Sequence, residues 1–342
     1  MVLAFFSQYL SNIDKITLED SSIMAATDLR GKTVFVVGGS GGLGKEMSKV
    51  IAAQGAHITI FSRNQEQLDD AKNEILAVRQ DEAQKISAVA GDMGTSSNAH
   101  SSIATQPSLP DILYCVAGGT PNECGFLLDL TPEVFERCMT NNYYSSVYPA
   151  QAVLKQWVED DSVSMIPKSP KIRKIIFVNS SASLVPAPGY LAYSAAKAAQ
   201  RALADTTRLE AMRYSNSKST YIVQYIFAHN FITPTFIEEQ KNKPELTKQI
   251  EGTTGSLAEL EKSFPYAAKI APEIVAEVAS NNFAITDKRV EPQFLWANMI
   301  GTSPKRGFGI IDSLLAFLGL FVYPFLRREM EQKCRADPSR NS

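Results

Sequence analysis

Short, strand-like apolar runs alternate along the chain with longer stretches that have the spacing of amphipathic helices. Two such helical stretches begin at Gly42 and Gln65. The alternation is typical of βαβ units and predicts an α/β fold with a doubly wound parallel sheet. The six predicted strands are Val34–Val37, His57–Phe61, Ile86–Val89, Ile112–Val116, Ile175–Val178 and Tyr221–Ile226.

One connection in this alternation is short. Between Asp92 and Asp111 there is little room, and there are few apolar residues, for the full helix that should link the third and fourth strands. A patch rich in Ser, Thr and Asn at 95–102 lies inside it and reads as solvated. We therefore expect a shortened helix, with an error of sequence or splicing as the alternative.

The end of the chain has a different pattern. Leu314–Leu326 is an almost unbroken apolar stretch of thirteen residues, bracketed by the basic pairs 305–306 and 327–328. Because a spanning helix needs about 20 residues, we expect a segment that lies on the membrane or re-enters it, with Pro324 bending its end. The basic flanks would then meet anionic headgroups. The alternative is a helix packed onto the core or onto a second subunit.

These patterns divide the chain into three parts. Residues 1–28 are predicted to be a flexible lead, and the apolar run 2–6 is too short for a signal-peptide core. Residues 29–303 form one α/β domain with a substrate-loop region at 229–265, because sheets covered by helices on both faces can extend to this size as one unit. Residues 304–342 form the tail, which we expect to contact a membrane.

Composition narrows the function. The 34 basic and 36 acidic side chains give a net charge of -2, and the absence of a block rich in Lys and Arg argues against nucleic acid as a partner. The cysteines lack CxxC spacing and the histidines lack metal spacing, so we expect no metal site and no disulfide framework. The cysteines therefore indicate a reducing compartment.

A glycine-rich run follows the first predicted strand and leads into a helix. Glycines allow a phosphate to approach the backbone, and the free N–H groups at the start of a helix bind it. The position of the run predicts a Rossmann-type dinucleotide site, with an ordinary strand-to-helix turn as the alternative. We assign Gly38, Ser40, Gly42, Leu43 and Gly44 to cofactor binding.

The second predicted strand is followed by Ser62 and Arg63. Enzymes that prefer NAD place an acid here to hold the ribose 2′-hydroxyl, whereas a hydroxyl and a guanidinium suit a 2′-phosphate. NADPH is therefore the predicted cofactor. In the alternative interpretation, Arg63 is a solvated loop cation.

Tyr193 and Lys197 are four residues apart on a predicted helix, so the phenol and the ammonium share one face. An isolated tyrosine has a pKa near ~10, and a nearby lysine cation lowers it because it favours the phenolate. Tyr193 is therefore the predicted general acid for carbonyl reduction. Ser180, at the carboxyl end of the fifth strand, would hydrogen-bond the substrate oxygen. Asn142, in the preceding helix, would order a water or hold the lysine. Each alone is more often a cap or a surface group.

Together these residues resemble the short-chain dehydrogenase/reductase family over residues 29–236. The resemblance implies that Tyr193 is the acid, that Lys197 binds the nicotinamide ribose and lowers the tyrosine pKa, and that Ser180 orients the carbonyl. Val37 and Val116 replace the threonine and asparagine that are usual in the family. Four further residues are assigned to the cofactor site, namely Asp92, Ala117, Gly118 and Thr233.

Segments at 142–149, 236–240, 243–248 and 301–304 further resemble the 3-ketodihydrosphingosine reductases. This implies reduction of 3-ketosphinganine, a long-chain keto-amine, to sphinganine by NADPH at the cytosolic face of the endoplasmic reticulum membrane. The residues leave open a reductase of another long-chain amino ketone or polyketide-like ketone, a cytoplasmic location and a homo-oligomer. They also leave open a non-catalytic scaffold that binds NADPH.

Overall fold

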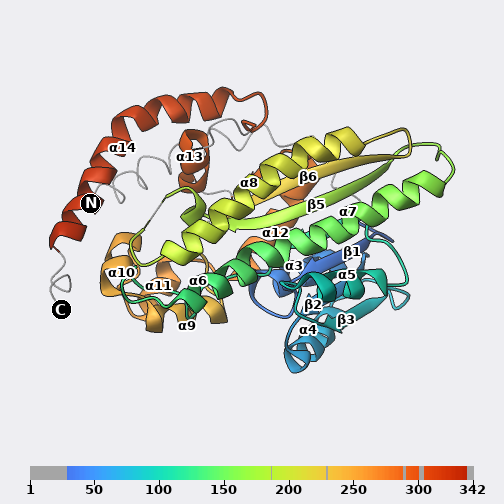
Figure 1. Cartoon of the computed structure of the whole chain (residues 1–342), viewed down its shortest axis with the longest axis horizontal. Coiled ribbons are helices and arrows are strands. Elements are labelled where there is room, and N and C mark those ends of the chain that lie inside the picture. The colour runs from blue at the N-terminus through green and yellow to red at the C-terminus, as the bar shows by residue number, and fades with distance from the viewer. Residues whose placement is uncertain (1–28, 186, 229, 288–289, 300–303, 337–342) are drawn as a thin grey trace.

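One parallel sheet of seven strands lies at the centre of the computed structural model (Figure 1). The structure describes residues 29–185, 187–228, 230–287, 290–299 and 304–336, so the predicted flexible lead lies outside it. The strand order is β3-β2-β1-β4-β5-β6-β7. The strands are β1 (Thr33–Val37), β2 (His57–Ser62), β3 (Ile86–Ala90), β4 (Ile112–Cys115), β5 (Lys171–Ser180), β6 (Ser219–Ala228) and β7 (Ala284–Thr286).

Helices cover both faces of this sheet, because alternate strand residues point to opposite sides. Val34 and Val36 of β1 face a core that includes α3 (Gly42–Ala53), α4 (Gln65–Ala77) and α12 (Ala267–Glu277). Phe35 and Val37 face the other core, which includes α5 (Ser96–Ala104), α7 (Ser145–Val163) and α8 (Leu191–Tyr214). The predicted doubly wound fold is therefore confirmed, and α5, with nine residues, is the short crossover helix.

The remaining elements lie mostly beyond the carboxyl ends of the strands. The described part of the substrate-loop region contains three short helices, α9, α10 and α11. Thr233 caps the start of α9, and its side chain accepts a hydrogen bond from the Phe236 N–H at 3.0 Å. These elements are α6 (Pro132–Met139), η1 (Thr140–Tyr144), η2 (Ser181–Ser183), α9 (Pro234–Asn242), α10 (Glu245–Glu251), α11 (Leu257–Ser263), η3 (Val278–Ser280), α13 (Val290–Met299) and α14 (Ile310–Ala336).

The apolar tail forms one continuous helix, α14, of 27 residues. Pro324 lies inside the helix and does not end it, so the helix is longer than the thirteen-residue apolar stretch that the sequence predicts. Ion pairs four residues apart, such as Arg327–Glu331 at 3.3 Å, support the polar end of the helix. Among the described residues, Ile310–Cys334 is the one helical stretch that is long and apolar enough to cross a membrane.

One side of α14 packs against α13. The Asn298 amide donates to the Leu315 carbonyl at 3.1 Å, and the ring of Phe294 stacks on Tyr323 at 5.6 Å between centroids. Gly319 is needed at this contact, because a β-carbon there would collide with the Asn298 side chain. The outward side carries apolar residues that are 44–69% exposed, namely Ile310, Ile311, Leu314, Phe317, Leu318, Leu320, Phe321 and Phe325.

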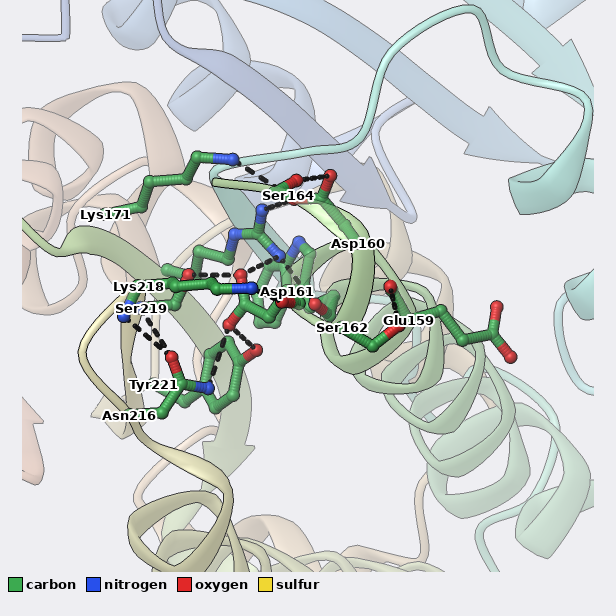
Figure 2. Close-up of polar contacts among 12 residues, drawn as sticks. Glu159, Asp160, Asp161, Ser162, Ser164, Lys171, Asn216, Lys218, Ser219 and Tyr221 are labelled. Carbon is green, nitrogen blue, oxygen red and sulfur yellow. Dashed lines mark hydrogen bonds and ion pairs between the residues drawn. The ribbon is translucent and has the colours of Figure 1, made fainter. Parts of the chain in front are cut away.

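A polar network ties the end of α7 to the amino ends of β5 and β6, away from the carboxyl edge (Figure 2). The buried Asp161 carboxylate accepts hydrogen bonds from the Tyr221 hydroxyl at 2.5 Å and the Ser219 hydroxyl at 2.9 Å. The buried Arg173 guanidinium lies 3.8 Å from Asp161 and also pairs with Asp160. Burial raises the pKa of Asp161, but these donors outweigh it and hold the pKa below its usual value. The network therefore needs Asp161 ionised.

We expect Asp161→Ala to lower the free energy of unfolding by about 3–5 kcal/mol, because it leaves the buried Arg173 without part of its counter-charge. Urea unfolding at neutral pH measures this loss. The matched control is Glu159→Ala, since the Glu159 side chain points away from the network (Figure 2) and is exposed.

The ionised Asp161 carboxylate also makes the stability of the protein depend on pH. Because the folded-state pKa of Asp161 is depressed, its stabilisation is present above the unfolded pKa near ~3.9 and is lost as the pH falls through the folded-state pKa. Lowering the pH should therefore reduce the free energy of unfolding of the native protein more than it reduces that of the Asp161→Ala variant. Equal acid sensitivity of the two proteins would contradict this role.

Candidate active site

A cavity of about 1910 Å³ opens at the carboxyl edge of the sheet. Residues at the ends of β1, β2, β4, β5 and β6 line it, together with residues of α9, α10 and α14. The carboxyl edge is where sheets of this type bind their ligands. Apart from Asn142, the residues predicted for the cofactor and for catalysis therefore line one continuous space.

The glycine run forms the floor of this cavity where β1 passes into α3. Gly38 has φ +85°, and a β-carbon there would lie 2.6 Å from the Ala117 nitrogen. A β-carbon on Gly44 would collide with the Gly38 carbonyl. The Leu43 side chain is buried in the core, so it can serve a ligand only through its backbone. This close-packed turn leaves the first N–H groups of α3 free for a phosphate.

The predicted 2′-phosphate residues lie beside this turn. The Ser40 hydroxyl donates to the Ser62 hydroxyl at 2.8 Å, which joins the glycine run to the end of β2. Arg63 is exposed, lines the cavity and donates to the Asn141 side chain at 2.9 Å. Asp92 lines the same part of the cavity and accepts from the Gly94 N–H at 2.9 Å. The guanidinium and hydroxyls fit a phosphate.

The end of β4 and Thr233 close the cofactor region. Val116 and Ala117 both donate their N–H groups to the Val37 carbonyl at 2.9 Å, so the two valines that depart from the family pattern keep the turn in place. Thr233 faces the glycine run, since a β-carbon on Gly42 would lie 3.5 Å from its methyl group. The residues present therefore fit a dinucleotide.

Gly118 separates the cofactor region from the catalytic residues. It has φ +151°, and a β-carbon there would lie 2.6 Å from Asn142 Oδ1 and 3.1 Å from Lys197 Nζ. The position therefore has no room for a side chain. This geometry brings Asn142 and Lys197 to the same backbone segment.

The structure brings Ser180, Tyr193 and Lys197 together, as the sequence predicts. Tyr193 lies in the first turns of α8, and Lys197 Nζ is 5.9 Å from the centroid of its ring. Ser180 ends β5, and its hydroxyl interacts with the Tyr193 phenol. The Lys197 ammonium is buried and donates to the Val178 carbonyl at 3.1 Å.

The pKa values differ from the sequence-based expectation. Burial raises the pKa of Tyr193, and contact with Ser180 opposes that rise only in part. Burial also lowers the pKa of Lys197 to about 8. The expected lowering of the tyrosine pKa by Lys197 is not seen in the protein alone, because desolvation dominates both groups.

Asn142 lies in η1 and is fully buried. Its amide donates to the Gly119 carbonyl at 3.0 Å, and its oxygen accepts from the Gly119 N–H at 2.8 Å. The side chain therefore fixes the backbone after β4, and no hydrogen bond joins it to Lys197 among the described residues.

Sequence reasoning missed Gln200, which holds the lysine instead. Its oxygen accepts from Lys197 Nζ at 3.4 Å and from the Asn179 amide at 2.8 Å. Its own amide donates to the Ser146 hydroxyl at 2.6 Å. The signal was available, since Gln200 follows Lys197 by three residues and therefore shares its face of α8.

Comparison with known proteins identifies a family and relatives of this chain. Residues 32–228 match the family model for short chain dehydrogenases. A fusion protein of Schizosaccharomyces pombe that includes a 3-ketodihydrosphingosine reductase is 32% identical over 88% of this chain, which spans 56% of that protein's length. The 3-ketodihydrosphingosine reductase of Yarrowia lipolytica is 31% identical over 91% of this chain and 80% of its own.

Among solved structures, levodione reductase superposes with a TM-score of 0.61 at 19% identity, over 74% of this chain and 92% of its own. At that identity the likeness supports the fold. The sequence matches carry the assignment further, since they extend over most of the chain. The chain therefore belongs to the short-chain dehydrogenase family, in the branch that holds the 3-ketodihydrosphingosine reductases.

Proposed function

We propose that this chain uses NADPH to reduce the 3-keto group of a long-chain amino ketone, 3-ketosphinganine, to the alcohol. The observation that carries the proposal is the meeting of Ser180, Tyr193 and Lys197 with the glycine-lined cofactor region in one cavity. The names of the relatives supply the substrate class.

Each residue has a distinct part in this chemistry. NADPH, when bound, supplies a hydride to the carbonyl carbon. The Ser180 hydroxyl orients the carbonyl oxygen, and the Tyr193 hydroxyl donates its proton to that oxygen as negative charge develops. Lys197, held by Val178 and Gln200, binds the nicotinamide ribose. Asn142 fixes the adjacent backbone.

We further infer that α14 holds the enzyme at the cytosolic face of the endoplasmic reticulum membrane. Its outward side is apolar, whereas Tyr323 and Leu326 line the active-site cavity. A substrate with an alkyl chain partitions into the bilayer, so a helix that borders both spaces suits its uptake. In the predicted basic flanks, Arg306 pairs with Asp312 and Arg327 with Glu331, which offsets part of the positive charge there.

We expect purified protein to oxidise NADPH with 3-ketosphinganine faster than with generic ketones, and Tyr193→Phe to lower kcat by about 10²–10⁴-fold. The proton donor is lost while the ring is kept, so NADPH binding should change little. The control is Tyr214→Phe at the far end of the same helix. Turnover of Tyr193→Phe near that of the native protein would sink the assignment, and absence of turnover in the native protein would favour the scaffold interpretation.

For the cofactor, we expect Arg63→Ala to raise the KM for NADPH by about one to two decades, while the KM for NADH changes little. The loss of a hydrogen bond between charged groups costs roughly 1.5–3 kcal/mol. Initial rates with both cofactors measure the effect, with Arg79→Ala, outside the cavity, as control. Equal changes in the two KM values would show that Arg63 is a loop cation.

For the membrane, we expect the native protein to float with phospholipid vesicles, and replacement of Leu314, Phe317 and Phe321 by glutamine to abolish flotation without unfolding the domain. These side chains are exposed, so the loss falls on membrane contact and not on the core. The control replaces Leu209 and Met212, two exposed apolar residues of α8, by glutamine. Flotation of the α14 variant equal to that of the control would refute the claim.

A further inference from the structure

A second polar cluster lies in the wall of the active-site cavity. The Tyr190 hydroxyl donates to Glu239 at 2.5 Å and lies 3.0 Å from Glu251. The Lys243 ammonium lies 2.8 Å from Glu239 and 2.5 Å from Glu251. Tyr190, Glu239 and Glu251 line the cavity, whereas the Lys243 side chain is 1% exposed. The carboxylates therefore face the cavity with the lysine behind them.

The chain holds this cluster firmly. Glu239 lies on α9, Lys243 ends that helix, and Glu251 ends α10. The Thr247 hydroxyl of α10 donates to the Pro188 carbonyl at 2.7 Å, next to Tyr190. The two loop helices are thereby fixed to the segment that leads into α8.

The cluster has an uncompensated charge. Two carboxyl groups face one ammonium, and the Tyr190 hydroxyl is neutral because burial holds its pKa well above the usual value. Burial also raises the pKa of Glu239, and the Lys243 ammonium opposes that rise. Tyr190 and Lys243 both bind Glu239 through Oε1 and Glu251 through Oε2. Glu239 Oε2 and Glu251 Oε1 have no hydrogen-bond partner within the described residues. When both carboxyl groups are ionised beside Lys243, the wall offers two carboxylate oxygens and one net negative charge.

This charge lies close to the reacting group. The rings of Tyr190 and Tyr193 are 5.8 Å apart between centroids. Besides burial, Glu239 and Glu251 both raise the pKa of Tyr193, so their field reaches its phenol. A cation bound by the two carboxylates would lie in the same cavity as a carbonyl bound at Tyr193, on the side of Tyr190.

We propose that Glu239 and Glu251 form the subsite that binds the ammonium group of the substrate. The inference rests on the proposed function, because a long-chain amino ketone carries its amine on the carbon next to the carbonyl. The carbonyl carbon and the carbon that bears the amine are directly bonded, so a site that binds both groups must place them in adjacent subsites. Lys243 keeps the two carboxylates together and leaves one negative charge for one ammonium.

The test compares 3-ketosphinganine with the ketone of the same length in which hydrogen replaces the amine. We expect Glu251→Gln and Glu239→Gln each to lower kcat/KM for the amino ketone about 10- to 100-fold more than for the neutral ketone, as the loss of a charged hydrogen bond implies. Glu238→Gln is the matched control, since Glu238 is on the same helix, has a side chain that is 47% exposed and pairs with Lys241.

A second measurement does not need turnover. Inhibition by a long-chain primary amine should weaken about tenfold or more in Glu251→Gln, whereas inhibition by the alcohol of equal length should not. If the cluster only holds α9 and α10 together, the glutamine variants would lose kcat/KM equally for both substrates and would lose inhibition equally for both inhibitors, and their melting temperature would fall. That outcome would overturn the inference. If the native protein reduces the neutral ketone but does not reduce 3-ketosphinganine, the proposed function would be overturned instead.

Discussion

The burial of the Lys197 ammonium is the constraint on which the active site depends. A charge out of water needs partners, and here these are the Val178 carbonyl and the Gln200 side chain. Asn179 donates both to the Lys197 carbonyl at 2.9 Å and to Gln200, so the same contacts dock α8 on the end of β5. Tyr193, one turn before the lysine, is thereby held against Ser180.

Much of this arrangement can be predicted from the sequence because it follows local rules. Strand-like runs marked six strands, and each overlaps a strand of the sheet. The glycine run marked the turn into α3, and a spacing of four residues put Tyr193 and Lys197 on one helix face. The seventh strand, Ala284–Thr286, has only three residues and no alternation of its own, so the sequence does not mark it. It is defined by its pairing with β6 in the folded sheet.

What the sequence could not show depends on three-dimensional surroundings. Burial, which sets the pKa of Tyr193, is a property of the folded cavity and not of the four-residue spacing. Glu239, Lys243 and Glu251 resemble ordinary charged residues of loop helices until α9 and α10 fold over Tyr190. The length of α14 was underestimated because the apolar run ends before the helix does.

The cavity extends from the predicted catalytic residues at its inner end to α14 at its outer end. Its inner part holds Tyr193, which we propose as the proton donor, and the carboxylates Glu239 and Glu251, whereas Tyr323 and Leu326 of α14 and several charged residues line its outer part. Lys333 of α14 donates to the Gln249 carbonyl of α10 at 3.3 Å, and these two helices lie near each other in Figure 1. A charged head bound at the inner end leaves an alkyl chain directed toward α14. Because an ammonium at the carboxylates offsets the field that raises the pKa of Tyr193, binding the correct head also eases the proton donation that follows.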